Sequence, residues 1–231
     1  MTERRSSFKK LADSMIGAIL VAGTLILSPV LRSWYNRWGA TEEELDRTLP
    51  GDDLVPKPDL GYTHAIPIHA RAADIWPWLV QIGQGRGGLY SYEGLENLAG
   101  CKIRNVDRVM PEFQDLKVGD LVRLGPQGYP CFVVETLEPG QALVLQGADP
   151  ETGEPPDLAA ESASYALATW QFILDERDEA ASRLIIRQRL AYSQDMALLW
   201  RLVEPISFVM ERNMMLTLKR HVERAVAQGR V

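Results

Sequence analysis

The chain contains 231 residues, of which 46% are hydrophobic and 24% are charged, and its formal net charge is −6. This length and composition favour one globular domain with appendages, and they exclude a mostly disordered chain. The acidic balance argues against nucleic acid as a partner, because binding to phosphates requires lysine and arginine clustered on one face.

Residues 1–35 form a basic and hydrophobic N-terminal segment. Its apolar part, residues 11–31, is only marginally long enough to cross a bilayer. Three interpretations stay open: an uncleaved membrane anchor, a secretory signal, and an amphipathic or buried helix packed on the domain. We favour the anchor, because the residues that follow offer a poor signal-peptidase site. The expected protein is therefore membrane-associated through residues 11–31, on either side of the membrane, with a cytoplasmic protein as the alternative.

Residues 36–60 predict a short helix and an irregular arm. Thr41 and Glu44 have the spacing of a capping box, in which each side chain satisfies a backbone N–H at the helix start. Residues 49–58 then contain three prolines and a glycine, which exclude regular structure. The main domain is expected over residues 61–228.

Within that domain, the first expected strand covers residues 62–68, where Pro67 indicates an edge or a bulge. Two helices follow at 72–81 and 91–99, and Pro77 is acceptable only if it lies in the first turn of its helix. Further strands are expected at 116–124, 130–137, 142–146, 166–174 and 184–190. The acidic segment 147–164 predicts a solvated loop or a lid. The chain is helical from residue 196, and Pro205 is expected to open the last helix.

This order predicts an α+β fold in which a curved antiparallel β-sheet wraps around a long C-terminal helix, behind an N-terminal hydrophobic helix. Small or flexible residues between sheet and helix leave a cavity in such packing. Ala166, Ala168 and the methionines of the last helix have this character.

Five strings carry a family resemblance: residues 38–41 (WGAT), 49–53 (LPGDD), 76–81 (WPWLVQ), 85–88 (GRGG) and 90–97 (YSYEGLEN). In them the chain resembles an uncharacterised bacterial branch of the SRPBCC superfamily, the START and polyketide-cyclase-like group, over about residues 61–228. The resemblance implies the helix-grip fold and a hydrophobic ligand cavity. Because that superfamily includes lipid carriers, hormone receptors and cyclases, it implies no particular reaction.

Gly83, Gly85 and Gly88 match the G-x-G-x-x-G dinucleotide fingerprint. The context is wrong for nucleotide binding, since a Trp-rich helix precedes the glycines where a buried strand is required. We expect them to permit a tight loop at the mouth of the cavity. Cys101 and Cys131 have no partner at metal-ligand spacing, so we expect ordinary thiols, no metal and no cofactor.

The best candidate ligand-binding patch follows this loop, because it combines charge, hydroxyl groups and an amide near aromatic surface. Its members are Arg86, Tyr90, Tyr92, Glu93, Glu96 and Asn97. The structural alternative is that Arg86 pairs with Glu93 or Glu96 and only fixes the loop.

Two strand residues complete the candidate ligand site. Trp170 either stacks on a ligand or fills the core. Gln188 is expected on the inward face, where a buried amide needs a partner, which a ligand can supply. Arg187 and Arg189 alternate with it and are expected to face solvent. His64 also lies on an inward face, where a structural role is favoured over that of a general base, so we assign no catalytic residue.

The expected function is non-enzymatic binding or transport of a hydrophobic small molecule, a lipid or a polyketide-like compound. The alternative is a cyclase or dehydratase in which Arg86, Tyr92, Glu93 and His64 orient a poly-carbonyl substrate and move protons. A third possibility is an interaction module in which the N-terminal segment and the acidic loop matter more than the cavity.

Overall fold

The computed structural model describes residues 2–155 and 165–229 of the chain, with side chains from Lys10 onward. The second half of the predicted loop or lid over 147–164 lies outside these residues. The α-helices are α1 (Thr2–Tyr35), α2 (Glu42–Asp46), α3 (Ala72–Val80), α4 (Glu93–Leu98) and α5 (Ala197–Ala227). The strands are β1 (Leu60–Ile68), β2 (Leu121–Arg123), β3 (Cys131–Glu138), β4 (Ala142–Ala148), β5 (Ala166–Asp178) and β6 (Ala181–Tyr192).

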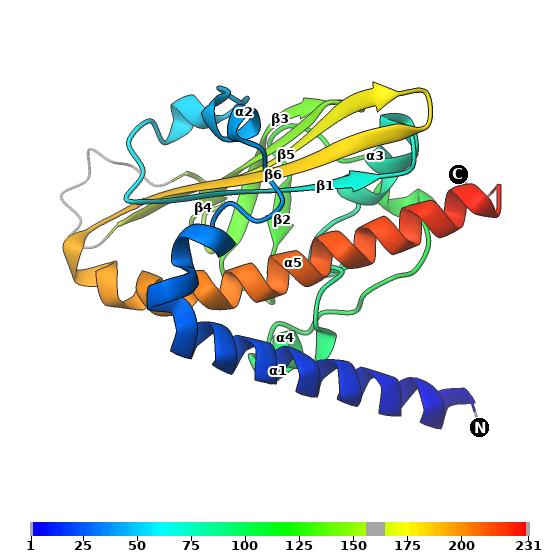
Figure 1. Ribbon diagram of the computed structural model, residues 1–231, viewed down its shortest axis with the longest axis horizontal. Coiled ribbons are helices and arrows are strands. Elements are labelled where there is room, and N and C mark those ends of the chain that lie inside the picture. The colour runs from blue at the N-terminus through cyan, green and yellow to red at the C-terminus, as the bar shows by residue number, and fades with distance from the viewer. Residues whose placement is uncertain (1, 156–164, 230–231) are drawn as a thin grey trace.

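The six strands form one antiparallel sheet in the order β1-β6-β5-β4-β3-β2. The sheet curves over α5, which confirms the predicted α+β helix-grip architecture (Figure 1). β1 is an edge strand, as its proline suggested, because an edge tolerates the missing N–H of Pro67. Residues 36–38 run beside this edge, and their carbonyl groups accept hydrogen bonds from the Thr63 and Ala65 N–H groups. The edge is therefore partly covered and protected from pairing with another chain.

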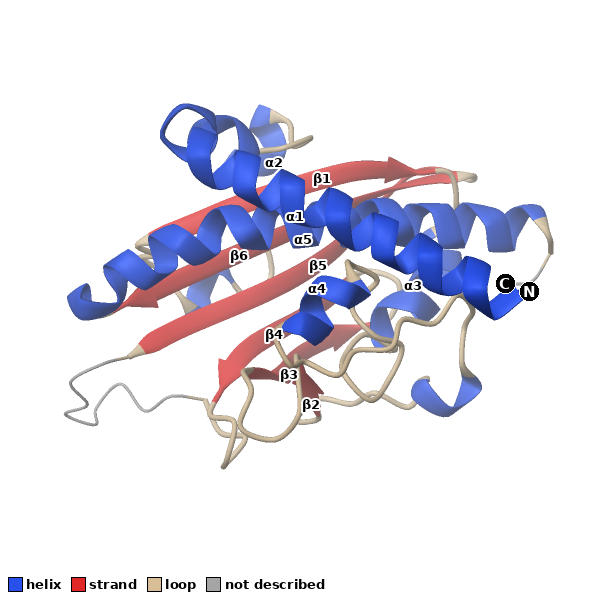
Figure 2. Cartoon of the chain, turned by 90° about the horizontal axis from the view of Figure 1, so that it is seen from below, coloured by secondary structure: helices blue, strands red, loops and turns tan. Residues whose placement is uncertain are grey.

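The molecule is layered, with the arm and α2 on one side of the sheet and α5 on the other (Figure 1). α1 lies against the far side of α5 and crosses it at an angle (Figure 2). One end of the sheet is closed by a dense core between α3, the inward strand faces and the C-terminal half of α5, including Trp78, Phe172, Met215, Leu218 and Val222. The other end of the sheet faces the N-terminal half of α5.

α1 packs on the domain along one side only. Tyr35 is fully buried and its ring stacks on Phe208 of α5, with ring centroids 5.3 Å apart. At Gly17 the helix approaches α4 so closely that a Cβ atom would lie 2.9 Å from the Tyr92 ring. The opposite side of α1 is exposed and apolar, and it includes Leu11, Met15, Ile19, Ile26 and Val30.

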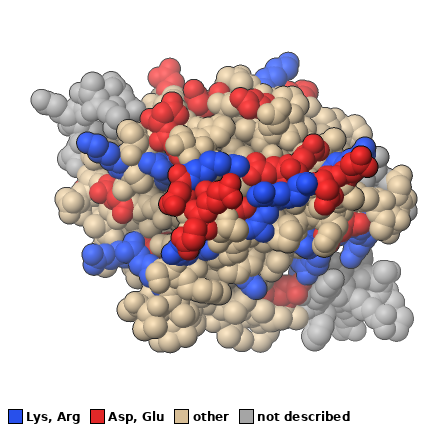
Figure 3. All heavy atoms as spheres, turned by 45° about the horizontal axis from the view of Figure 1, so that its top comes forward, with Lys and Arg blue, Asp and Glu red and all other residues tan. Residues whose placement is uncertain are grey.

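The arm covers the outer face of the sheet, and this corrects one prediction. Arg187, expected to face solvent, is only 5% exposed. Its guanidinium donates to the carbonyl groups of Glu44, Leu45 and Arg47 and to the carboxylate of Asp52. The strand alternation correctly placed Arg187 on the outer face of the sheet, but α2 and the arm cover that face and exclude solvent from it. Figure 3 shows interleaved acidic and basic side chains in a band across this side of the molecule.

Two local features of residues 36–60 agree with their sequence. The Thr41 hydroxyl accepts from the Glu44 N–H, and the Glu44 carboxylate accepts from the Thr41 N–H, which confirms the capping box. Gly39 has φ +74°, and a Cβ atom there would lie 2.1 Å from the Ala65 carbonyl oxygen. The glycine is therefore needed both for the left-handed backbone and for the close approach to β1.

Two prolines lie deeper in their helices than predicted. Pro77 is in the second turn of α3, which begins at Ala72, and Pro205 lies well inside α5, which begins at Ala197. Each proline removes one helical hydrogen bond. Both are buried or half-buried among other elements, so tertiary packing maintains the helix through the missing bond.

Candidate ligand cavity

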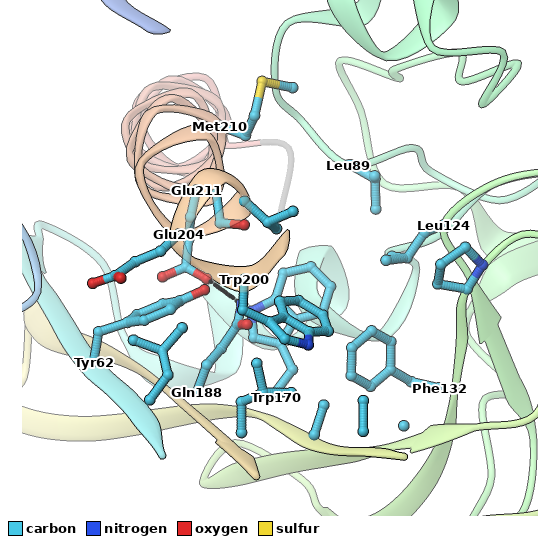
Figure 4. Close-up of a pocket in the computed structure, with 18 of the residues that line it drawn as sticks. Tyr62, Leu89, Leu124, Phe132, Trp170, Gln188, Trp200, Glu204, Met210 and Glu211 are labelled. Atoms are coloured by element: carbon cyan, nitrogen blue, oxygen red, sulfur yellow. Dashed lines mark hydrogen bonds between the residues drawn. The ribbon is translucent and has the colours of Figure 1, made fainter. Parts of the chain in front are cut away.

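A cavity of about 470 Å³ lies between the sheet and the N-terminal half of α5 (Figure 4). Most of its wall is apolar. The lining residues are Leu60, Tyr62, Leu89, Ser91, Glu96, Leu124, Pro130, Cys131, Phe132, Gly147, Ala148, Ala166, Ala168, Trp170, Gln188, Leu190, Trp200, Val203, Glu204, Ser207, Met210, Glu211 and Met214.

The cavity exists because the strand ends facing it carry small residues. Ala166 and Ala168 take the inward positions at the start of β5, whereas Phe172 and Leu174 take the equivalent positions in the dense core. Gly147 and Ala148, at the end of β4, also line the cavity and likewise have little or no side-chain volume. The predicted effect of the β5 alanines is thus confirmed, since removing side-chain volume between sheet and helix leaves a space.

One buried carboxylate, Glu211 of α5, organises the polar side of the cavity. Its Oε2 accepts hydrogen bonds from Trp170 Nε1 at 3.0 Å and from Gln188 Nε2 at 2.8 Å (Figure 4). Tyr62, Gln188 and Trp170 are register partners on three neighbouring strands, so they form one row across the sheet beneath this carboxylate.

The second oxygen of Glu211 meets His64 Nδ1 at 2.6 Å, and His64 Nε2 lies 2.8 Å from the Tyr35 carbonyl oxygen. Because a carbonyl only accepts, Nε2 carries a proton. The short Nδ1–carboxyl contact then requires a second proton, on either the ring or the carboxyl. In both cases the His64–Glu211 pair is neutral overall, and both ring nitrogens are occupied.

The other polar lining groups differ in how well they are partnered. Glu204 accepts from Arg32 Nε at 2.8 Å and from Asn36 Nδ2 at 2.6 Å, so its charge is neutralised from the α1 side. Burial first, and then the nearby charges of Glu211 and Glu204, hold the pKa of the Tyr62 phenol well above its usual value. Tyr62 is therefore a neutral hydroxyl at the cavity wall.

Glu96 of α4 is the exception among the cavity carboxyls. It is 6% exposed, and its Oε2 atom has no hydrogen-bond partner among the described residues. Burial, and then the neighbouring carboxylate of Glu93, raise the pKa of Glu96 to about 7. The cavity therefore contains one carboxyl group whose Oε2 atom no described side chain satisfies and whose charge changes near neutral pH.

Trp170 and Gln188, predicted from strand alternation, both line the cavity. The partner of the Gln188 amide is Glu211. Whether either residue contacts a ligand stays a prediction.

Of the six candidates around the glycine loop, Glu96 lies among the lining residues and the other five do not. The Arg86 guanidinium donates to the carbonyl groups of Val80 and Phe113, and forms neither of the carboxylate pairs that we considered. The Tyr90 hydroxyl donates to the Trp78 carbonyl and accepts from Gln81 Nε2. Both side chains fix the loop that Gly83 and Gly88 close by mutual backbone hydrogen bonds.

The remaining three candidates hold α4 in place. Asn97 exchanges two hydrogen bonds with the Ile103 backbone. Glu93 pairs with Lys10 of α1 at 2.6 Å, and the Tyr92 ring packs beneath α1 at Gly17. These three side chains therefore make contacts within the protein, and their contact with a ligand stays a prediction.

Sequence reasoning did not single out Glu204 and Glu211, although a signal was present. They lie seven residues apart, on the same face of α5 as Phe208, Leu218 and Val222. Acidic residues within the inward stripe of an amphipathic helix are costly unless paired, and therefore mark a polar site.

No protein-family model matches the chain, and no curated protein matches it. Among solved structures, the chain is similar to a conserved protein from Geobacillus kaustophilus, with 9% identity, a TM-score of 0.41, and coverage of 72% of this chain and 97% of that one. It is also similar to the Aha1 dimer from Colwellia psychrerythraea, with 16% identity, a TM-score of 0.39, and coverage of 71% and 96%. CalU16 from Micromonospora echinospora shares 13% identity, with a TM-score of 0.32 and coverage of 72% and 86%. At these identities the similarity concerns the fold alone.

Proposed function

We propose that this chain binds a hydrophobic small molecule in the cavity between the sheet and α5. The observation that carries the proposal is a cavity of about 470 Å³ with a mostly apolar wall and a few convergent polar groups. Sites for drug-sized ligands have this size and composition. A carrier or sensor role fits better than catalysis by His64, since that ring offers no free nitrogen to a ligand.

Native mass spectrometry of the full chain, purified from a lipid-rich host and combined with solvent extraction, tests this proposal. We expect a defined extra mass that is lost in Ala168→Phe, because the new ring fills the cavity from β5. Ala180→Phe, in the exposed β5–β6 turn, is the matched control and should retain that mass. An extra mass that survives Ala168→Phe would contradict binding in this cavity.

A cyclase or dehydratase is the second candidate, and Glu96 is the observation that favours it. A general acid–base group must reach the substrate and titrate near the working pH. Glu96 lies among the residues that line the cavity, and its pKa is raised to about 7. This candidate predicts turnover of a poly-carbonyl compound that Glu96→Gln abolishes while binding remains. Binding without turnover would leave the carrier role alone.

We also propose that α1 associates with a membrane through its exposed face. Lys10–Tyr35 is long and apolar enough to cross a bilayer, with a mean hydropathy of 2.1, and little of it is buried. Exposed leucines at the start of α5, among them Leu198 and Leu202, add to the apolar surface. Exposed apolar side chains that gather in a patch are typical of membrane or protein contacts.

A further inference from the structure

The charged side chains of the cavity wall all have the same sign. They are Glu96, Glu204 and Glu211, and the described part of the chain contributes no lysine or arginine to the lining. A molecule that enters an apolar cavity loses its hydration, so any charge it carries must be balanced by the wall. A carboxylate or phosphate would find only carboxyl groups and neutral hydrogen-bonding groups there. The wall therefore disfavours anionic ligands.

Two of the three carboxyl groups are already balanced by the protein. Arg32 neutralises Glu204, and the His64–Glu211 pair is neutral, with both Glu211 oxygens engaged. Glu96 is the one left, since its Oε2 atom is buried without a partner within the described part of the chain. A buried polar atom of this kind is satisfied when a ligand donates to it.

We infer that the cavity selects a hydrophobic amine, which places its ammonium group against Glu96. This inference deepens the proposed function and depends on it. An ammonium group donates a charge-assisted hydrogen bond to the carboxylate, which a neutral hydroxyl does not match in strength. The rings of Phe132, Trp170 and Trp200 also line the cavity, and aromatic faces attract cations. Both observations favour a positively charged ligand.

Three fluorescent probes with one aromatic body test the inference: 1-pyrenemethylamine, 1-pyrenemethanol and 1-pyrenecarboxylate. Each is titrated against the full chain at neutral pH. We expect the amine to bind about tenfold more tightly than the alcohol, the gain typical of a charge-assisted hydrogen bond. The carboxylate should bind more weakly than the alcohol.

The key variant is Glu96→Gln, which keeps the shape of the side chain and removes its charge. We expect it to abolish the advantage of the amine over the alcohol. Glu93→Gln makes the same change on the same helix at a residue outside the cavity wall, so it should retain the advantage. An advantage that survives Glu96→Gln would overturn the inference.

Other outcomes separate the inference from the proposed function. Equal affinities for all three probes, lost in Ala168→Phe, would leave the binding cavity intact and overturn the selection of amines. Binding of no probe, or binding that Ala168→Phe leaves unchanged, would overturn both. Tighter binding of the carboxylate would also overturn the inference and would point to Arg123, the strand partner of Cys131 in the β2–β3 ladder.

Discussion

At the scale of single residues, the His64–Glu211 pair shows how proton counting constrains a buried site. The contacts require either two protons on the imidazole, or one proton on the imidazole and one on the carboxyl group, and neither arrangement carries net charge. A neutral amide at position 211 reproduces every contact, with Nε2 donating to His64 and Oε1 accepting from Trp170 and Gln188. Position 211 therefore requires hydrogen-bonding groups and does not require a charge.

We predict that Glu211→Gln changes the free energy of unfolding by less than about 1 kcal/mol, whereas Glu211→Ala lowers it by about 3 kcal/mol or more. Alanine leaves the donors of Trp170 and Gln188 buried without an acceptor. Urea denaturation at pH 7 measures both values. Equal destabilisation by glutamine and alanine would show that the ionic form of the pair dominates and that our count is wrong.

Glu96 makes the stability of the fold depend on pH. Its pKa rises from 4.5 to about 7 on folding, so the native state binds more protons than the unfolded state between these values. The contribution of this group to stability is therefore greatest at low pH and falls as the pH rises through 7. Between pH 5 and pH 8 this group lowers the free energy of unfolding by about 2 to 3 kcal/mol.

Glu96→Gln should remove that pH dependence, because glutamine does not titrate. We expect the variant to match the parent chain near pH 5 and to exceed it in stability at pH 8. Denaturation at several pH values checks this. The same pH slope in parent and variant would assign the dependence to another group.

Only part of this site was accessible to reasoning from sequence. Strand alternation fixes which side chains face the helix, so Trp170 and Gln188 were placed in the cavity wall. In loops the direction of a side chain depends on the backbone of each residue, and Tyr90 has a positive φ of 55° that no periodicity predicts. The chemistry of the loop therefore suggested a site, while its geometry directs those side chains into protein contacts.

At the scale of elements, the strands and the order of the helices were predictable from the sequence. The segments that cover the outer face of the sheet were not. The outer face of the sheet carries Ala65, Ile173 and Ile185, which the arm buries together with Leu49. A proline-rich segment has no periodicity from which to infer where it packs. For the same reason, Arg187 was correctly assigned to the outer face and wrongly assigned to solvent.

The exposed face of α1 leads to a prediction about lipid. Ile19 is 68% exposed and Ile26 is 78% exposed, and neither side chain contributes to the packing on α5. We expect the full chain to co-sediment with phosphatidylcholine vesicles and the double variant Ile19→Asp with Ile26→Asp to bind at least about tenfold less, because each aspartate must lose its hydration to enter the interface.

Val118→Asp is the matched control for this experiment, since Val118 is 62% exposed and lies outside α1 and α5. It should bind vesicles like the parent chain. Vesicle binding that is equal in the double variant, or absent from the parent chain, would rule out the face of α1 as the lipid contact.

At the scale of the whole molecule, α1 belongs to the folded unit although its sequence is typical of an anchor. Its last turn supplies the Tyr35 carbonyl to His64 and the Arg32 guanidinium to Glu204. The same helix covers the Tyr92 and Phe208 rings. The His64–Glu211 pair and Glu204, on the polar side of the cavity, therefore depend on a segment that sequence analysis placed outside the domain.

Deletion of residues 2–35 tests this dependence. We predict a loss of more than about 3 kcal/mol of unfolding free energy, because the deletion exposes the Phe208 and Tyr92 rings and leaves Glu204 without its cation. Deletion of residues 2–9 is the control and should change stability little, since the packing of Tyr35, Arg32 and Gly17 remains. Thermal unfolding of the three chains compares them.

Equal melting temperatures would mean that α1 is a detachable anchor, and that the cavity keeps its polar side without it. A destabilised truncation would instead mean that α1 meets the membrane with its outer face while its inner face stays on α5, so lipid contact and ligand cavity are parts of one structure.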